Sequence, residues 1–464
     1  MGNLVLAGPS NPGISAKVDS QRSINWYQVK PEREGDRVHL RGRPGFELHC
    51  TLPKSPIRGV LDFTGRFFCV AGARVYEVYA NGTYRDWGAI GSVEGKVTMA
   101  ALLDVIVIGD GSGYYALDLA AGTIAVITAA PRGRFCVFYN QRILYQGENG
   151  QVFYSELNDA TNIPGLNFFT AEGLPDEIVA ITTAEDQILL HGADSTELWY
   201  DSGDADNPFQ RISGGSVYSG CGAPDTALRL DNASWWVETD KDGAGIVRRL
   251  QGTTALRVST SAVERFTATA TNLSAHSYQE EGHTFYVLNA DQGTWVFDLK
   301  SQEWHERAWL NRNTGEQERS RPEAHVFCYG LHLVTDYESG KVYRQSLAYH
   351  SDAGQEIRRT RVSAHADQSG KAVIVDELFL DFATGVGLVT GQGSDPKVML
   401  RVSHDGVTFG SERTASLGKI GQFRNRVRFH RLGRGTDFLF EISVSDPVLS
   451  VLMDGDVKVR VGAR

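Results

Sequence analysis

Short runs of apolar residues alternate with glycine- and aspartate-rich turns along most of the chain. A typical unit is RFFCVAGARVYEVYANG, which starts at Arg66 and consists of an apolar strand, a tight turn and a second strand with an aromatic residue near its start. Comparable units start at Asp104, Gln141, Gln187, Ala233, His283 and Leu331. Such runs, bounded by turn residues, predict a series of β-hairpins.

The hairpins recur at a spacing typical of β-propeller blades. A four-stranded blade takes about 40 to 50 residues, and it can bury its faces only against neighbouring blades. We therefore predict a β-propeller of six or seven blades over residues 58–349, with an array of β-sandwiches as the alternative. The count stays open because one hairpin could pair with the N-terminal segment to close the ring. The second strands begin near Val75, Tyr114, Val152, Leu198, Ile246, Val296 and Val342, at steps of 39, 38, 46, 48, 50 and 46 residues.

Three segments outside this repeat have other patterns. Residues 1–57 contain extended, proline-punctuated pieces and predict an arm with one or two edge strands. Residues 350–372 are polar and predict a linker or a long hairpin. A strand pattern restarts in VIVDELFLDF and KVMLRVSHDG, which predicts an antiparallel β-domain over residues 373–464. The chain is thus predicted to be all-β, because even its best helical candidate, residues 261–271, is rich in threonine and β-branched residues.

Composition and charge exclude several classes of protein. Of the 464 residues, 41% are hydrophobic, which excludes a disordered chain. The net charge of −10 does not favour binding to free nucleic acid, which needs a basic field. The five cysteines lie far apart and predict free thiols in a reducing compartment. No apolar stretch is long enough to span a membrane, and the first residues, MGNLVLAGPS, lack the pattern of a signal peptide.

Patterns that would support catalysis or metal binding are sparse. The sequence has no nucleophile elbow, no H-E-x-x-H motif and no P-loop, and residues 109–113 (GDGSG) fit a hairpin turn. His305, His325 and His332 show no metal-site spacing and are expected to be structural. We therefore predict no enzyme, no catalytic residue, no cofactor and no metal site. Aspartate-rich turns around residues 201–206, 240–242 and 454–456 leave calcium binding as an open alternative.

Two aromatic patterns bear on a possible sugar site. Trp235 and Trp236 lie on a predicted strand and fit a blade core better than a sugar-stacking surface. SHDGVTF, residues 403–409, resembles the Asp-box turn of sialidase-type propellers with one residue missing, and that turn is structural. It keeps a carbohydrate-binding or glycoside-hydrolysing β-propeller as the alternative function, although a glycosidase would also need a suitably spaced carboxylate pair.

A basic strand near the C-terminus is the strongest candidate for an interaction site. Arg424, Arg426 and Arg428 are spaced by two, so we expect them to share one strand face, opposite Phe423, Val427 and Phe429. Arg431 and Arg434 extend the basic character. On an acidic protein such a face predicts docking to an acidic partner or to DNA phosphates, with a merely solvated face as the alternative. A second basic cluster lies in the predicted linker and comprises Arg358, Arg359 and Arg361.

Three stretches resemble a known family. SQRSINWYQVKPE, from Ser20, resembles the family's Q-R-C-x-N-W-Y-P-E opening, with Ser23 in the place of cysteine and Gln28 inserted. RGRPGFEL, from Arg41, resembles its T-P-G-L segment, with Arg43 in the place of threonine. Residues 395–448, which include SLGKIGQFRNRVRFHRLGR, are similar to the ending of phage tail proteins. The family is that of the packaged-DNA stabilisation or tail accessory (nozzle) proteins of short-tailed bacteriophages.

This resemblance implies a structural role in the virion tail. The family's members assemble after DNA packaging, in the host cytoplasm, as a ring below the portal and its adaptor, and the resemblance implies a hexamer. They help to retain the DNA, support tail fibres, spikes or a needle, and form part of the ejection channel, through which double-stranded DNA passes without sequence specificity. The basic strand and the N-terminal arm, with Trp26 and Tyr27, are then the expected contacts between subunits or with tail partners.

Overall fold

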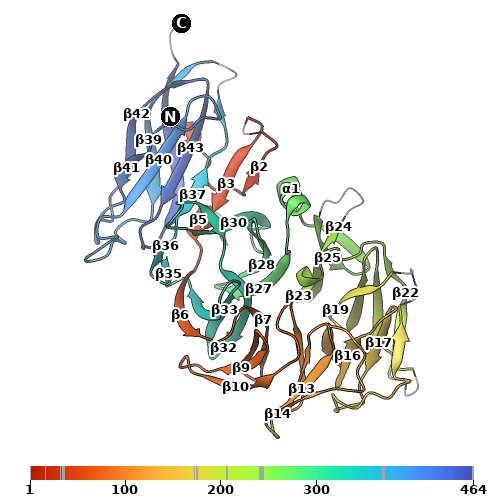
Figure 1. Cartoon of the computed structure of the whole chain (residues 1–464). Coiled ribbons are helices and arrows are strands. Elements are labelled where there is room, and N and C mark those ends of the chain that lie inside the picture. The colour runs from red at the N-terminus through yellow and green to blue at the C-terminus, as the bar shows by residue number, and fades with distance from the viewer. Residues whose placement is uncertain are drawn as a thin grey trace.

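A computed structural model describes residues 2–461, except residues 16, 32, 34–36, 172, 174–175, 205–206, 240–244 and 368–370. A ring of short sheets forms one end of the molecule, and an elongated β-sandwich, drawn in blue, rises from one side of it (Figure 1). Both parts consist mainly of antiparallel strands, and the parallel pairings between strands of the described chain are β3 with β30 and β35 with β6. The structure confirms an all-β chain with a propeller and a separate C-terminal β-domain.

The ring is a propeller of seven four-stranded blades within the described residues. Six blades use strands that follow one another along the chain. The first is β7–β10 (Ile57–Phe63, Arg66–Ala71, Arg74–Val78, Tyr84–Ala89), and the second is β11–β14 (Thr98–Leu102, Val105–Gly109, Tyr114–Asp118, Thr123–Val126). The third is β15–β18 (Cys136–Tyr139, Arg142–Gln146, Gln151–Tyr154, Phe168–Thr170), and the fourth is β19–β22 (Ile178–Ala184, Gln187–Gly192, Thr196–Asp201, Phe209–Val217). The fifth is β23–β26 (Leu228–Leu230, Ala233–Thr239, Gly245–Gln251, Thr254–Arg257), and the sixth is β27–β30 (Ser274–Glu280, His283–Ala290, Gly293–Asp298, Glu303–Leu310).

The seventh blade closes the ring with a strand from the N-terminal segment. β32 (Pro322–Cys328), β33 (Leu331–Asp336) and β34 (Lys341–Ser346) form its first three strands, and β6 (Gly45–Thr51) pairs with β34 as the fourth. The innermost strands of successive blades touch in order, and β32 packs against β7 of the first blade. The pairing with the N-terminal segment therefore resolves the blade count to seven.

Alternating side chains explain why the blades stack. Trp235 and Trp236 are consecutive residues of β24, so they point to opposite faces of the fifth blade. Trp235 stacks on Tyr286 of the sixth blade at 5.3 Å between ring centroids, and Trp236 packs among fourth-blade residues such as Leu189. Both tryptophans are buried, as expected for a blade core. Each blade thus buries one face against each neighbour.

Two antiparallel sheets form the sandwich. One runs β4 (Trp26–Val29), β5 (His39–Gly42), β44 (Val451–Val461), β39 (Val373–Phe382), β42 (Val427–Gly435), with β1 (Gly2–Leu4) beside β44. The other runs β3 (Ser20–Ile24), β37 (Arg359–Val362), β43 (Asp437–Val444), β40 (Lys397–Ser403), β41 (Arg413–Ser416), with β2 (Asn11–Pro12) beside β3 and β38 (Ala366–Asp367) beside β43. Side chains such as Leu378, Leu400 and Phe440 fill the space between them.

The N-terminal 57 residues differ from the expected extended arm. β1 to β5 are built into the sandwich, while β6 belongs to the propeller. Residues 350–372, expected as a linker or long hairpin, hold the short hairpin of β35 (Ser351–Asp352) and β36 (Gln355–Glu356), then β37 and β38. The polar sequence of this segment does not indicate these strands, because β37 pairs with β3 and β43, and β38 with β43, and none of these pairings is a local hairpin.

Few elements interrupt the strands. α1 (Ser261–Thr269) precedes the sixth blade at the weak helical candidate, η1 (Pro224–Thr226) precedes the fifth, and β31 (Gln317–Arg319) pairs with β30. Among the described residues, no helix is long and apolar enough to cross a membrane.

Candidate interaction surfaces

Trp26 and Tyr27 lie inside the chain and not on an exposed arm. Their exposed fractions are 0% and 2%. Trp26 belongs to the sandwich core, whereas Tyr27 packs with Tyr278 and Phe285 of the sixth blade. The expectation that these two residues contact another subunit is wrong for this fold, because neither side chain is accessible.

The same junction holds a fully bonded arginine. The Arg43 guanidinium donates to both carboxylate oxygens of Asp352, at 3.0 and 2.7 Å, and to Asn25 Oδ1 at 2.7 Å. It also donates to the carbonyl oxygens of Pro44 and Ala308. Because a guanidinium has five N–H donors, all of them are used. Arg43 therefore ties the N-terminal segment to β30 of the propeller and to β35.

Two arginines of the second basic cluster are buried and cannot form a docking surface. Arg359 and Arg361 lie on β37 and are 1% and 0% exposed. Arg361 donates to the Pro9 carbonyl oxygen at 2.9 Å and to Gln21 Oε1 at 2.8 Å, so the N-terminal segment covers it. Burial lowers the pKa of each guanidinium to about 10, which still leaves both charged at neutral pH.

The predicted arginine face of β42 is exposed, but only part of it lies on the strand. β42 begins at Val427, so Arg428 and Arg434 are strand residues, while Arg424 and Arg426 lie in the loop before it. Val427 and Phe429 point into the core as expected, but Phe423 is 74% exposed. The alternation of side chains does not extend to Phe423, because this residue lies in the loop before β42 begins. Arg431 has a positive φ of 55° and is also exposed.

The five arginines of this region differ in their partners. Arg426 Nε lies 2.9 Å from Asp381 Oδ1, and its Nη2 lies 3.8 Å from Asp456. Arg428 contacts the Phe379 ring, with its guanidinium carbon 5.0 Å from the centroid. Within the described part of the chain, Arg428 has no ion-pair partner, and the same holds for Arg424, Arg431 and Arg434. Four exposed cations are therefore available to an external acidic group.

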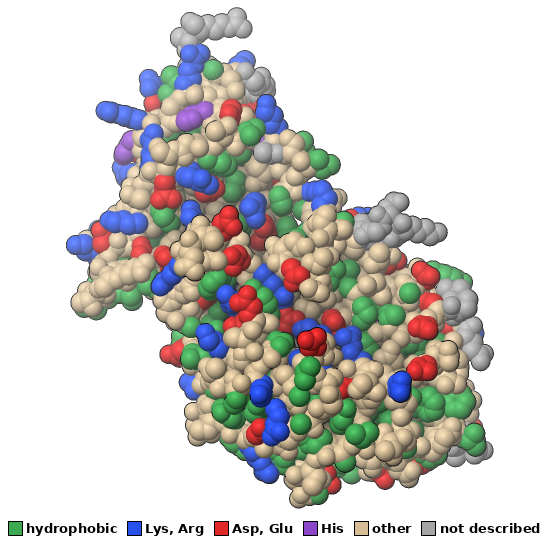
Figure 2. Space-filling view, in the orientation of Figure 1, with side chains coloured by type: hydrophobic (Ala, Val, Ile, Leu, Met, Phe, Trp, Pro, Cys, Tyr) green, Lys and Arg blue, Asp and Glu red, His purple; other side chains and the backbone are tan. Residues whose placement is uncertain are grey.

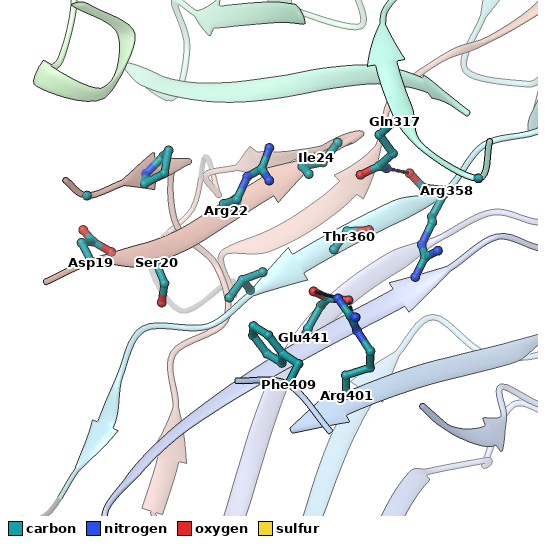
Figure 3. Close-up of a pocket in the computed structure, with 14 residues that line it drawn as sticks. Asp19, Ser20, Arg22, Ile24, Gln317, Arg358, Thr360, Arg401, Phe409 and Glu441 are labelled. Carbon is teal, nitrogen blue, oxygen red and sulfur yellow. Dashed lines mark hydrogen bonds and ion pairs between the residues drawn. The ribbon is translucent and has the colours of Figure 1, made fainter. Parts of the chain in front are cut away.

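A polar groove of about 530 Å³ lies where the sandwich meets the propeller (Figure 3). Arg401 on β40 forms a two-bond ion pair with Glu441 on β43, at 2.8 and 2.6 Å, and Phe409 lies beside it. On the opposite side Gln317 donates to the Arg358 carbonyl oxygen at 3.0 Å. No sequence motif indicated this groove, because its walls come from strands far apart in the chain.

A second cavity, of about 570 Å³, opens at the centre of the propeller. Two of its acidic groups are paired with cations: Asp225 lies 2.8 Å from Arg134, and Glu323 contacts both Lys96 and Arg319. Asp291 also lines the cavity and accepts hydrogen bonds from Thr271 and Asn272. Burial alone would raise the pKa of Glu323, but the two cations outweigh it and lower the pKa to about 2. A carboxylate held ionised in this way is a poor general acid.

The remaining sequence motifs form turns or lie in the core, and each has a structural role. Asp110 in GDGSG accepts hydrogen bonds from the backbone N–H groups of Ser112 and Gly113, which is a hairpin turn. Asp405 accepts from the backbone of Val407 and Thr408 in the turn after β40, so the Asp-box-like segment lies in the sandwich and caps a turn. His305 is buried at the junction, close to Tyr27.

Cysteine and possible metal ligands give no further site. All five cysteines are free and buried. No group of three or more metal-ligating side chains occurs among the described residues. Asp454 and Asp456 lie within strand β44 and not in a turn, while Asp206, Asp240 and Asp242 lie outside the described residues.

Comparison with protein families matches both domains. The model described as "Bacteriophage P22 Gp10, beta-propeller" matches residues 17–348. The model described as "Bacteriophage P22 Gp10, beta-sandwich" matches residues 358–460. The chain belongs to the bacteriophage P22 Gp10 family. As a member of the Gp10 family it is a structural protein of a phage tail and a component of the virion.

Other comparisons are distant. The chain is 11% identical to virginiamycin B lyase from Staphylococcus aureus, with a TM-score of 0.41 over 62% of this chain and 94% of that chain. It is 11% identical to BamB from Moraxella catarrhalis, with a TM-score of 0.39 over 70% and 97% of the two chains. For PorZ of Porphyromonas gingivalis the identity is 11% and the TM-score 0.40, over 71% of this chain and 44% of that chain. Comparison with curated proteins finds no match.

Proposed function

We propose that this Gp10-family protein assembles as a ring, of six copies by the resemblance, below the portal and adaptor of a phage tail. In this position it retains packaged DNA, supports tail fibres, spikes or a needle, and lines part of the ejection channel. Assembly takes place in the host cytoplasm, after packaging. The observation that carries the proposal is the exposed face of β42, where Arg428 and Arg434 lack an ion-pair partner in the described chain.

The connections between the sandwich and the propeller support a structural role in the tail. Sandwich and propeller are joined by β4, by Arg43 and by the pairing of β3 with β30 at Ile24 and Glu306. Several independent connections restrict hinge motion between the domains. A rigid subunit can hold a channel open and keep the tail proteins that bind to it at fixed positions.

Charge supports the passage of DNA without adhesion. The chain has a net charge of −10, which a ring multiplies around its axis. A lumen of this sign repels phosphate groups, so DNA can slide through it. The basic face of β42 would then lie against an acidic surface of the adaptor, away from the lumen.

Electron microscopy of the protein mixed with its portal–adaptor complex tests the proposal. We expect a ring added beneath the adaptor. Arg428→Glu/Arg434→Glu should weaken this addition at least tenfold and leave the melting temperature unchanged. The control is Arg132→Glu/Arg229→Glu, which makes the same change of charge at exposed propeller residues. Particles that never attach to the adaptor would refute the ring, and equal effects of the two double variants would refute the docking role of β42.

A further inference from the structure

Two loops at one end of the sandwich form a tip that exposes apolar side chains. Residues 383–396 connect β39 to β40, and residues 417–426 connect β41 to β42. The loops pack closely, since a Cβ added to Gly385 would lie 2.5 Å from the Phe423 ring. We call these two loops the sandwich tip. Four of its apolar residues have large exposed fractions: Leu388 41%, Val389 80%, Ile420 55% and Phe423 74%.

The sandwich tip is also basic. Its two loops contain three basic residues, Lys419, Arg424 and Arg426, and one acidic residue, Asp395. Lys419 and Arg424 are exposed beside the apolar side chains, and neither has an ion-pair partner in the described part of the chain. Apolar side chains surrounded by charge are typical of a protein–protein contact and not of a purely solvated loop.

The third and fourth blades carry the opposite charge. Residues 136–217, which form these blades, contain thirteen Asp and Glu residues and only two basic residues, Arg142 and Arg211. The turns β15–β16, β17–β18, β19–β20 and β21–β22 all open on one face of these blades, because antiparallel strands reverse direction at each turn. We call this the acidic blade face. Among the residues that the structure describes, its exposed acidic residues are Asp159, Glu185, Asp186 and Asp204.

The acidic blade face has exposed apolar residues of its own. Leu157 and Leu166, in the loop between β17 and β18, are 54% and 89% exposed. Asn140 on the third blade donates to Asp201 on the fourth at 3.1 Å, which holds the two sets of turns together. The face is therefore complementary to the sandwich tip both in charge and in apolar character.

The two surfaces lie on different sides of one molecule: the sandwich tip is at the end of the sandwich nearest the propeller, where Phe382 contacts Trp26. The blades that contain β16, β17, β19 and β22 are at the far side of the propeller from the sandwich (Figure 1). Blue side chains are spread over the sandwich, and red ones lie along the outer edge of these blades (Figure 2). The surfaces cannot meet within one chain, so complementarity of this kind requires a second molecule. A head-to-tail contact between unlike surfaces builds a closed ring when its rotation closes.

We propose that the sandwich tip of one copy docks on the acidic blade face of the next copy, and that this contact builds the ring. Phe423 and Ile420 would pack against Leu157 and Leu166, and Lys419 and Arg424 would pair with Asp159 and the acidic residues beside it. This inference rests on the ring of the proposed function and specifies how neighbouring subunits recognise each other.

Carbodiimide cross-linking of purified virions tests the contact directly. The reagent joins an amine to a carboxylate only where the two already touch. Mass spectrometry should find Lys419 joined to Asp159, Glu185, Asp186 or Asp204, in a species with twice the mass of the chain. Lys419 joined only to other tail proteins or to another surface of this chain would overturn the proposal.

Charge exchange gives a second test that does not depend on a loss of folding. Lys419→Glu/Arg424→Glu and Asp159→Lys/Asp186→Lys should each reduce ring formation on the adaptor at least tenfold, and all four changes in one chain should restore it. Glu148→Lys/Asp194→Lys is the matched control, since these exposed acids lie in the turns on the opposite face of the same blades. A ring that forms equally well with either reversed pair refutes this contact and leaves the proposed function intact. The absence of any ring with the native protein refutes the proposed function itself.

Discussion

Trp26 and Tyr27 are neighbours in β4, yet their rings lie in two different domains. The Trp26 ring is 6.3 Å from Phe382 in the sandwich, and the Tyr27 ring is 5.4 Å from Phe285 in the sixth blade. This follows from the alternation of side chains along a strand. One face of β4 packs into the sandwich core and the other packs against the sixth blade, so β4 contributes to both domains.

Replacement of Trp26 by alanine should destabilise the sandwich strongly. The buried ring leaves a cavity, and changes of this kind cost about 3–5 kcal/mol. Urea unfolding should show a clearly lower midpoint. Phe423→Ala is the control, because an exposed aromatic residue contributes within about 0.5 kcal/mol. Equal midpoints for the two variants would contradict the assignment of Trp26 to the core.

The propeller could be predicted from sequence because its signal is local. Each blade is a set of consecutive hairpins, so apolar runs and turn residues recur at the blade period. The seventh blade needs β6, which lies hundreds of residues before β34. The sequence alone therefore predicts six or seven blades and leaves the pairing that closes the ring open. The family resemblance came from the ends of the chain, and those ends form the sandwich and the junction.

The interaction sites were predictable only in part, for a physical reason. Arg359 and Arg361 have the same spacing of two as Arg426 and Arg428, and both pairs lie in or next to a strand. Arg361 is buried under the carbonyl groups of Gly8, Pro9 and Arg22, and Arg359 lies against Gly42 of β5, while Arg426 and Arg428 are exposed. Residue spacing indicates a shared face, but only tertiary contacts decide whether that face is buried.

Arg426 and Arg428 should differ in their effect on stability, although both are exposed. Arg426→Glu places a third carboxylate beside Asp381 and Asp456, so we expect a loss of about 0.5–1 kcal/mol after solvent screening. Arg428→Glu removes no ion pair and should leave the free energy of unfolding within about 0.5 kcal/mol. Thermal unfolding of both variants at low salt measures the difference. A larger loss for Arg428→Glu would show that the contact of Arg428 with the Phe379 ring contributes more to stability than the Arg426 ion pairs.

His191 should make the fold sensitive to mild acid. Its ring is fully buried and bonded to Thr182 and Thr196, and burial lowers its pKa to about 3. The unfolded chain takes up this proton near pH 6.5 and the folded chain does not, so stability is lost as the pH falls below about 6.5. The loss approaches about 1.4 kcal/mol per pH unit for this residue.

The pH effect can be assigned by substitution. His191→Gln lacks the titrating ring, so the difference in unfolding free energy between pH 7.5 and pH 5 should be smaller by about 2 kcal/mol. The measurement is urea unfolding of both proteins at the two pH values. An unchanged difference would mean that His191 takes up its proton in the folded state as readily as in the unfolded one.

Gly45 should tolerate no side chain at the point where β6 closes the propeller. A Cβ there would lie 2.5 Å from the Ser351 carbonyl oxygen and 2.7 Å from that of Tyr349, and backbone atoms cannot move aside as a flexible side chain can. Gly45→Ala should therefore cost about 1–3 kcal/mol. Gly113 is the matched control, since a Cβ there meets no atom within 4 Å, and Gly113→Ala should be neutral or slightly stabilising. Hydrogen exchange should show the loss of protection concentrated in β6 and β34, because these strands hold the ring closed. Protection lost evenly across all blades would instead mean that the ring unfolds as one unit whichever blade is weakened.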